Sequence, residues 1–100
     1  MKIKEGVILA GLDIKMRPVL IKADRIWFEH GQELVVTSGL EGTHSAGSLH
    51  YYGLALDFRT RYFDDKQVVE DVYDILSRSL SVNYDVVLHS THIHVEYDPK

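Results

Sequence analysis

Histidine is concentrated near the end of the chain, where residues 89–97, HSTHIHVEY, hold three of the six histidines. Alternate side chains of a β-strand share a face, so His92, His94 and Glu96 would point the same way in a strand here. Neutral imidazole is the commonest metal ligand in proteins, and such ligands need rigid placement. Two histidines side by side on the polar face of a strand therefore form half of a metal site.

The other half is predicted in residues 48–57, SLHYYGLALD. His50 and Asp57 both carry metal-binding groups, and Gly53 between them lets the chain turn sharply enough for the two side chains to converge. Two imidazoles and one carboxylate, with a fourth position left to water, are the pattern of a catalytic zinc centre rather than a closed structural one. Such a centre would lower the pKa of its bound water to roughly 7 and would polarise a carbonyl group.

Two helices that could support this site are predicted by apolar residues at three- and four-residue spacing. The first spans residues 17–31, with Pro18 in its first turn. The second spans residues 64–80, where Asp64 is the expected N-cap and Gln67 its capping partner. The buried faces are expected to consist of Val19, Leu20, Ala23, Ile26 and Trp27 in the first helix and of Val69, Val72, Leu76 and Leu80 in the second.

Four strands are predicted by β-branched residues and by alternation of apolar and polar positions. They span residues 34–38, 54–60, 84–90 and 92–97, and the glycine-rich residues 39–49 are expected to form a loop. The order helix, strand, strand, helix, strand, strand predicts a single α+β domain over all 100 residues. In such a domain the helices pack on a small, largely antiparallel sheet.

Composition narrows the classes of function. The chain has 45% apolar and 26% charged residues, which is typical of a soluble globular domain. A net charge of -4 predicts neither a nucleic-acid partner nor an anionic membrane surface. The absence of cysteine excludes disulfides, thiolate metal sites and thiol nucleophiles. The apolar run VILAGL near the N-terminus is too short for a signal peptide or for a membrane span, which needs about 20 apolar residues.

The motifs resemble those of a known peptidase family. SLHYYGLALD is similar to the Ser-x-His-x-x-Gly-x-Ala-x-Asp signature of the zinc D-Ala-D-Ala carboxypeptidases and L-alanyl-D-glutamate endopeptidases. His92-Ile93-His94 resembles the downstream His-x-His that this family shares with lysostaphin-type peptidases and the hedgehog signalling domain. The stretches VVTSGLEGTHSAGSLHYYGLALDFRT and THIHVEYDP look like a compact phage and prophage branch, and the likeness extends from the first helix to Pro99.

The resemblance implies a function and a role for each of these residues. His50, Asp57 and His94 would bind one zinc ion, with water as the fourth ligand, and His92 would support proton transfer beside that water. The chain would be a monomeric zinc peptidase with a hedgehog/DD-peptidase-like fold, cutting the peptidoglycan stem peptide as an endopeptidase or D,D-carboxypeptidase. It would be encoded by a phage or prophage gene and made in the cytoplasm of a bacterial host. It would act at the cell wall or in the periplasm.

His89 completes a His-x-x-His-x-His run that is similar to that of some carboxypeptidases, where it would be a further acid/base. In a regular strand His89 would face away from His92. The role therefore requires a bend or bulge at residues 90–91.

Two positions depart from the family pattern. Thr91 stands where many members have an acidic base, and Leu40 stands where many have an arginine that holds a substrate carboxylate or oxyanion. One possibility is that histidines do the proton work. The other is a weak or inactive zinc-containing domain that binds cell-wall peptide or a phage protein, or whose zinc only stabilises the fold.

Several side chains are expected near the substrate, and each has a structural alternative. Positive charge would come from His44, Arg59 or Arg61, although His44 could order its loop and Arg59 could pair with a carboxylate such as Glu96. His92 could be a hydrogen-bond partner of the site rather than a proton-transfer residue. The substrate-binding candidates are Ser48, which could bond locally, His44, Arg59, and Tyr52, which could be a packing residue.

Overall fold

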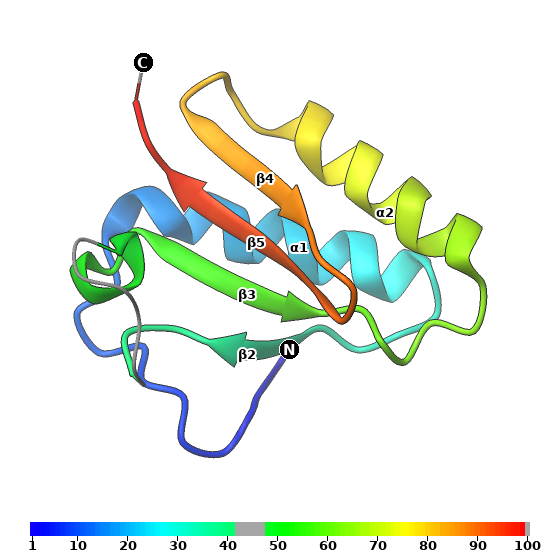
Figure 1. The fold of residues 1–100 in the computed structure, drawn as a ribbon, viewed down its shortest axis with the longest axis horizontal. Helices are drawn as coiled ribbons and strands as arrows, with labels where there is room; N and C mark the ends of the chain where they lie inside the picture. Colours follow the sequence, from blue (N-terminus) through cyan, green and yellow to red (C-terminus); the bar gives the residue numbers. More distant parts are fainter. Residues whose placement is uncertain (42–47, 100) are drawn as a thin grey trace.

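Two helices cover one face of a five-stranded sheet in the computed structural model of the chain, which describes residues 1–41 and 48–99 (Figure 1). The helices are α1 (Arg17–Glu29) and α2 (Lys66–Ser79). The strands are β1 (Lys2–Ile3), β2 (Val35–Ser38), β3 (Ala55–Arg59), β4 (Tyr84–Leu88) and β5 (His92–Tyr97). Two short 3-10 helices, η1 (Ile14–Met16) and η2 (Leu49–Tyr52), precede α1 and β3.

The strands lie in the order β1-β2-β3-β5-β4. β1 pairs with β2 in parallel, and all the other neighbours are antiparallel. β4 and β5 form a hairpin in which the amide of His89 donates to the carbonyl oxygen of His92 at 2.9 Å, so that the loop consists of Ser90 and Thr91. The predicted α+β architecture, with helices on a largely antiparallel sheet, is confirmed.

The hydrophobic core lies between the helices and the sheet. Trp27 of α1 meets the ring of Phe58 of β3 edge-on, with 5.7 Å between the centroids, and its Nε1 donates to the main-chain oxygen of Arg59 at 2.8 Å. Burying a side chain as large as phenylalanine contributes about 1.5–3 kcal/mol relative to leaving it exposed. Trp27 and Phe58 therefore fix the end of β3 against α1.

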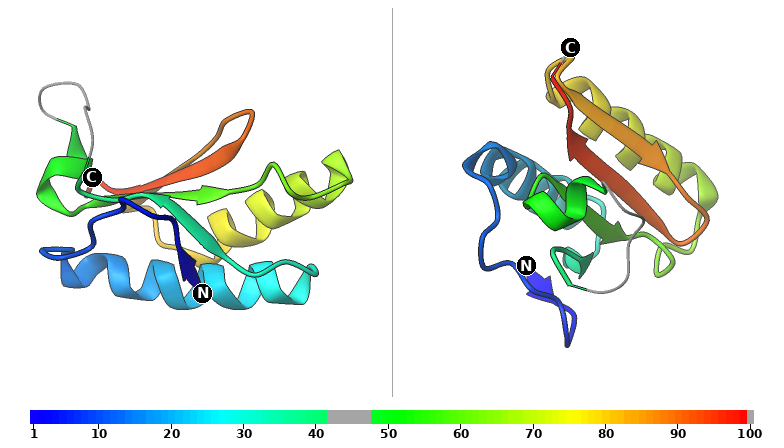
Figure 2. Two further views of the ribbon diagram at one scale, coloured as in Figure 1. Left: turned by 90° about the horizontal axis from the view of Figure 1, so that it is seen from below. Right: turned by 60° about the vertical axis from the view of Figure 1, so that its left-hand side comes forward.

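Alternation along β5 decides which face of the sheet can do chemistry. Ile93 and Val95 are fully buried, whereas His92, His94 and Glu96 are only partly buried. The left view of Figure 2 shows α1 and α2 together on one side of the sheet. The three polar residues lie on the opposite face, which the helices leave open. Among the described residues, no helix is long and apolar enough to cross a membrane.

The start of α2 differs from its prediction. Asp65, not Asp64, is the N-cap, and its carboxylate accepts the amide of Gln67 at 2.8 Å. Because the helix begins one residue later than predicted, the side chain of Gln67 points along the helix and donates to Asp71 instead of reaching back. The residues of α2 that pack in the core follow a four-residue repeat, Val68, Val72, Leu76 and Leu80, so Val68 takes the place predicted for Val69.

β5 has the bounds that were predicted, whereas α1, β2, β3 and β4 are shorter than predicted by one or two residues at their ends. β1 was not predicted at all, because two residues are too few to show alternation. The amide of Lys2 donates to the carbonyl oxygen of Leu34 and the amide of Lys4 to that of Val36, which brings the N-terminal segment alongside β2.

Candidate metal centre

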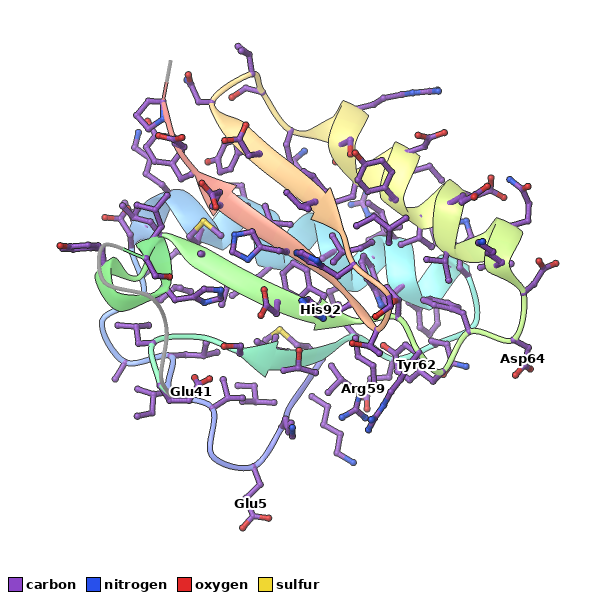
Figure 3. All side chains as sticks on the ribbon, in the orientation of Figure 1. Glu5, Glu41, Arg59, Tyr62, Asp64 and His92 are labelled. Carbon is purple, nitrogen blue, oxygen red and sulfur yellow. The ribbon has the colours of Figure 1, made fainter. Side chains whose placement is uncertain are left out.

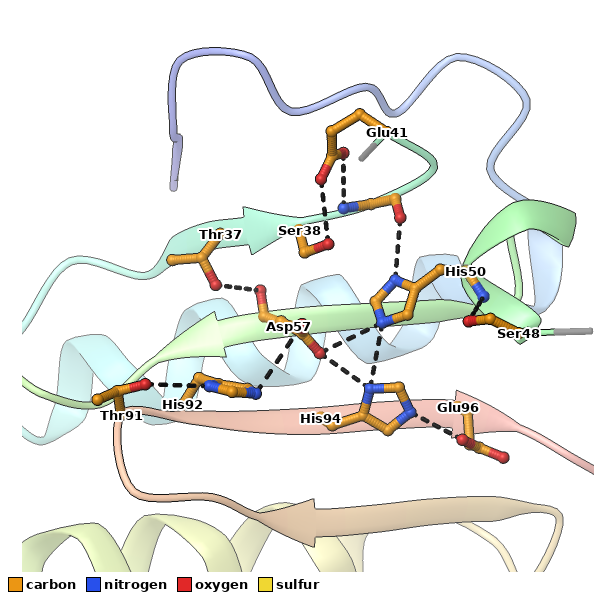
Figure 4. Close-up of polar contacts among 11 residues, drawn as sticks. Thr37, Ser38, Glu41, Ser48, His50, Asp57, Thr91, His92, His94 and Glu96 are labelled. Atoms are coloured by element: carbon orange, nitrogen blue, oxygen red, sulfur yellow. Dashed lines mark hydrogen bonds and ion pairs between the residues drawn. The ribbon is translucent and has the colours of Figure 1, made fainter. Parts of the chain in front are cut away.

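Three metal-binding side chains meet on the open face of the sheet: His50 from η2, Asp57 from β3 and His94 from β5 (Figure 4). His94 Nδ1 lies 2.9 Å from Asp57 Oδ1 and 3.2 Å from His50 Nε2. The distance from His50 Nε2 to Asp57 Oδ1 is 3.4 Å. Ligands placed tetrahedrally at zinc bond lengths of roughly 2.0–2.1 Å lie about 3.3 Å from one another. The group could therefore hold a metal ion.

The sheet itself positions two of these ligands. Asp57 is the direct cross-strand partner of His94 in the β3–β5 register. Opposed residues of an antiparallel pair share a face and have Cβ atoms about 4.5–5.5 Å apart. The two side chains are therefore held together by main-chain pairing on rigid elements.

The third ligand is positioned by a tight turn. Ser48 begins η2, and its hydroxyl accepts the amide of His50 at 3.3 Å. Gly53 ends η2 with a φ of 70°, and a Cβ at this position would lie 2.4 Å from the carbonyl oxygen of Gly11. Only glycine tolerates both conditions. The turn leads into β3 and leaves the side chain of His50 only 5% exposed beside Asp57.

Each of the two histidines has its second ring nitrogen held by an oxygen acceptor. His50 Nδ1 donates to the carbonyl oxygen of Gly39 at 2.9 Å, and His94 Nε2 donates to Glu96 Oε1 at 2.7 Å. A carbonyl oxygen only accepts, so the proton of His50 is on Nδ1 and its Nε2 presents a lone pair. Metal-binding histidines are almost always held in this way. The donor set therefore fits a metal ion at His50 Nε2, Asp57 Oδ1 and His94 Nδ1.

The lone pairs of His50 Nε2, Asp57 Oδ1 and His94 Nδ1 lie so close together that they repel one another unless a positive charge lies among them. In the metal-free chain a proton on His94 is favoured, because the hydrogen bond to Asp57 raises the pKa of His94 against the effect of burial, and Glu96 raises it further. Burial would raise the pKa of Asp57, but hydrogen bonds from the two histidines, together with the positive charge of a protonated ring, outweigh it and hold that pKa well below its usual range. A bound cation would take the place of the proton.

His92 lies at the edge of this group. Its Nε2 is 4.0 Å from Asp57 Oδ2, and its Nδ1 is 3.2 Å from the hydroxyl oxygen of Thr91. Burial lowers the pKa of His92, an effect that Asp57 partly offsets, and the three neighbouring histidines lower it further. These effects favour the neutral form of His92, which can accept a proton.

His89 reaches the same face through the hairpin loop. The chain reverses at residues 90–91, so His89 becomes the cross-strand neighbour of His92 rather than a residue further along the same strand. The two rings stack with 4.7 Å between their centroids. The bend that an acid/base role requires is thus present.

The other predicted residues are distributed around the site. Glu96 bonds to His94, and Arg59 lies opposite His92, so the alternative in which Arg59 pairs with Glu96 is not found. Tyr52 is 64% exposed on η2. Leu40 lies against Gly11, and His44 falls outside the described residues.

Sequence reasoning missed the groups that orient the two histidine ligands by accepting a hydrogen bond from the second nitrogen of each ring. Glu96 could have been found, because it shares the strand face of His94 two residues away. The carbonyl of Gly39 left no signal, because any residue type has one. Glu41 fixes this peptide: its Oε1 accepts the amides of Ile8 and Gly39, both at 2.8 Å, and its Oε2 accepts the hydroxyl of Ser38 at 3.0 Å.

No protein-family model matches the chain, and no curated protein matches it. The assignment of the site therefore depends on its geometry and on the motifs that place its residues.

Proposed function

We propose that this chain is a zinc-dependent peptidase that cleaves peptide bonds of peptidoglycan, as an endopeptidase or a D,D-carboxypeptidase. The observation that carries the proposal is the convergence of His50, Asp57 and His94 on the open face of the sheet, with His92 beside them. Their resemblance to the motifs of zinc peptidases of the cell wall supplies the substrate class.

The donor chemistry supports zinc. Two imidazole nitrogens and one carboxylate oxygen are the ligands of many catalytic zinc sites, and three protein ligands leave one position open. When bound there, zinc activates water as a nucleophile and polarises the carbonyl of the bond to be cut. His50, Asp57 and His94 would hold the ion, while Gly39 and Glu96 would keep the two imidazoles in orientation.

We assign proton transfer to His92. The hydroxyl of Thr91 can accept the proton of Nδ1, which leaves Nε2 as the basic nitrogen on the side of Asp57. A neutral imidazole there can take a proton from the attacking water and return it to the leaving amine. The stacked ring of His89 restricts the orientation of His92.

We further propose that the chain is made in the cytoplasm of a bacterial host from a phage or prophage gene, and that it acts as a monomer at the cell wall or in the periplasm. The motif resemblance supports this part of the proposal.

The test is mass analysis of purified peptidoglycan peptides after incubation with the zinc-loaded protein. We expect shortened peptides that disappear when a chelator is added and return with zinc. The matched control is His94→Ala, which keeps the hairpin but lacks one ligand. Unchanged peptides with zinc-loaded wild-type protein would contradict the proposal.

A second candidate is a zinc-containing domain that binds cell-wall peptide or a phage protein without cutting it. Thr91 favours this candidate, because its hydroxyl occupies the position next to His92 where an acidic base is expected. Calorimetric titration of the zinc-loaded chain with stem peptide separates the two, since binding with no cleavage products would support the second candidate.

A further inference from the structure

Residues 8–13 of the N-terminal segment lie against the two turns that position His50, and Glu41 joins this segment to the first of these turns (Figure 3). Glu41 is not one of the three metal-binding side chains. We infer that Glu41 is a positioning residue of the metal centre: its carboxylate holds the carbonyl group of Gly39 where that group orients the ring of His50, and it thereby raises the affinity for the metal. The inference rests on the proposed zinc-dependent function.

The carbonyl group of Gly39 is held from both sides. On one side, Glu41 Oε1 accepts the amide of Gly39 at 2.8 Å. On the other, the amide of Leu40, which belongs to the same peptide group as this carbonyl, donates to the carbonyl oxygen of Ile8 at 2.9 Å. The oxygen of Gly39 accepts His50 Nδ1 at 2.9 Å (Figure 4). The orientation of the imidazole ring therefore depends on the position of this one peptide group.

Ile8 closes the set of hydrogen bonds around Glu41. Its amide donates to the same Oε1 at 2.8 Å, while its carbonyl oxygen accepts the amide of Leu40. A Cβ on Gly39 would lie 2.4 Å from that carbonyl oxygen, so the N-terminal segment packs directly on the turn. Glu41 Oε2 accepts the hydroxyl of Ser38 at 3.0 Å. One carboxylate thus joins the N-terminal segment, the turn and the end of β2.

The same N-terminal segment also meets the turn that follows His50. The amide of Asp13 donates to the carbonyl oxygen of Gly53 at 2.9 Å, and a Cβ on Gly53 would lie 2.4 Å from the carbonyl oxygen of Gly11. The other imidazole ligand, His94, is instead held by a residue of its own strand, Glu96. Loss of the Glu41 carboxylate should therefore disturb His50 and leave His94 in place.

The contacts of Glu41 suit an ionised carboxylate. Burial raises the pKa of Glu41, but hydrogen bonds from the amides of Ile8, Glu41 and Gly39 and from the hydroxyl of Ser38 outweigh it and keep this pKa below its usual value. An ionised carboxylate only accepts hydrogen bonds, and those it accepts are roughly twice as strong as bonds between neutral groups. Glutamine would keep one acceptor oxygen without the charge, and alanine would keep neither, so the two substitutions should have graded effects.

The test measures zinc affinity and the state of the His50 ring in the full chain. In Glu41→Ala the affinity, measured by chelator competition, should fall about tenfold, which is the lower end of the usual loss when a group that orients a metal ligand is removed. Glu41→Gln should lose less. The resonance of the proton on His50 Nδ1 reports the bond to Gly39. It should move or broaden in Glu41→Ala, with and without zinc, whereas the resonance of the proton on His94 Nε2 should be unchanged.

Asp65→Ala is the matched control. The Asp65 carboxylate also accepts a main-chain amide, that of Gln67 at 2.8 Å, but it caps α2 instead of supporting the metal centre. The control should lower Tm and leave the zinc affinity and both histidine resonances as in the wild type. If Glu41→Ala behaves like this control, with only Tm lowered, its role is merely structural and the inference is overturned.

These measurements do not depend on the cleavage of a peptide. Weaker zinc binding and an altered His50 resonance in Glu41→Ala, with no cleavage by the wild-type protein, would contradict the peptidase and support the positioning role. Cleavage by the wild-type protein, with unchanged affinity and an unchanged His50 resonance in Glu41→Ala, would contradict the positioning role alone. A wild-type chain that binds no zinc would contradict both.

Discussion

His50 and His94 present different ring nitrogens to the same point. His50 uses Nε2 and is held at Nδ1 by the main chain, whereas His94 uses Nδ1 and is held at Nε2 by Glu96. His92, two residues from His94, has neither arrangement, since its Nε2 is 4.0 Å from Asp57 and its Nδ1 is bonded to Thr91. These contacts suit His94 to the ligand role, and His92 to the proton-transfer role, that we propose for them.

This division predicts different results for two neighbouring substitutions. His94→Ala should lose zinc, because two remaining donors are too few, whereas His92→Ala should keep zinc and turn over about 10²–10⁴ times more slowly. Elemental analysis combined with single-turnover rates measures both effects. Equal zinc loss in the two variants would show that the division is wrong.

Zinc affinity should depend on pH through His94 rather than Asp57. The protonated form of His94 must lose its proton before Nδ1 can bind zinc, and its raised pKa keeps that proton bound to a higher pH than the usual value of about 6.5. Asp57 stays ionised throughout, because its pKa lies well below the usual range. Affinity measured by chelator competition should therefore fall as the pH drops through the histidine range. A decline that begins only near pH 4 would assign the dependence to a carboxylate instead.

At the scale of elements, the turn between η2 and β3 controls where His50 lies. Gly53→Ala should reduce the free energy of unfolding by about 1–3 kcal/mol and weaken zinc binding, because the new Cβ meets the carbonyl of Gly11 at 2.4 Å and φ is positive. Gly31→Ala is the matched control: φ is also positive, at 88°, but nothing lies within 4 Å. It should cost less stability and leave zinc affinity unchanged. Denaturant unfolding and chelator competition give both quantities, and equal losses of affinity would contradict the role of the turn.

Strand alternation made much of the site predictable. Asp57 and His94 follow from the alternation of their strands together with a turn at Gly53, and the structure places them opposite each other. The position of His89 could not be derived, because it depends on whether the chain bends at residues 90–91. The supporting contact to Gly39 was also beyond prediction, because it uses the backbone of a loop whose path depends on tertiary packing.

The order of elements along the chain predicted the architecture but not all of its edges. Two helices and four strands in that order leave few ways to bury their apolar faces, so the α+β packing followed. β1 has only two residues and gains its position from the edge of β2. The N-cap of α2 was misplaced by one residue because two adjacent aspartates are equally able to cap, and packing of the four-residue repeat selects the second.

At the scale of the whole molecule, the residues that stabilise the fold and the residues of the metal centre lie on opposite faces of the sheet. Both helices lie on one side of the sheet (Figure 2), and the core lies between them and the strands. The residues of the metal centre lie on the opposite face. Without a cation, the partly buried Asp57 must be balanced by protons on its neighbours. Metal binding should therefore stabilise the entire fold, since it is linked to the folded state alone.

Thermal melting with and without a chelator measures this linkage. Free zinc at 100 times its Kd should add about 2.7 kcal/mol, which raises Tm by roughly 10–20 °C in a domain of this size. In His50→Ala the two melting curves should coincide. Coincident curves in the wild-type protein would contradict metal-linked stability.

We expect His50, Asp57 and His94 together to hold one zinc ion. The most direct test is the zinc content of the wild-type protein after chelator treatment, reconstitution and equilibrium dialysis against micromolar zinc at pH 7.5. The geometry of the three donors predicts one zinc per chain. A content near zero under these conditions would contradict it.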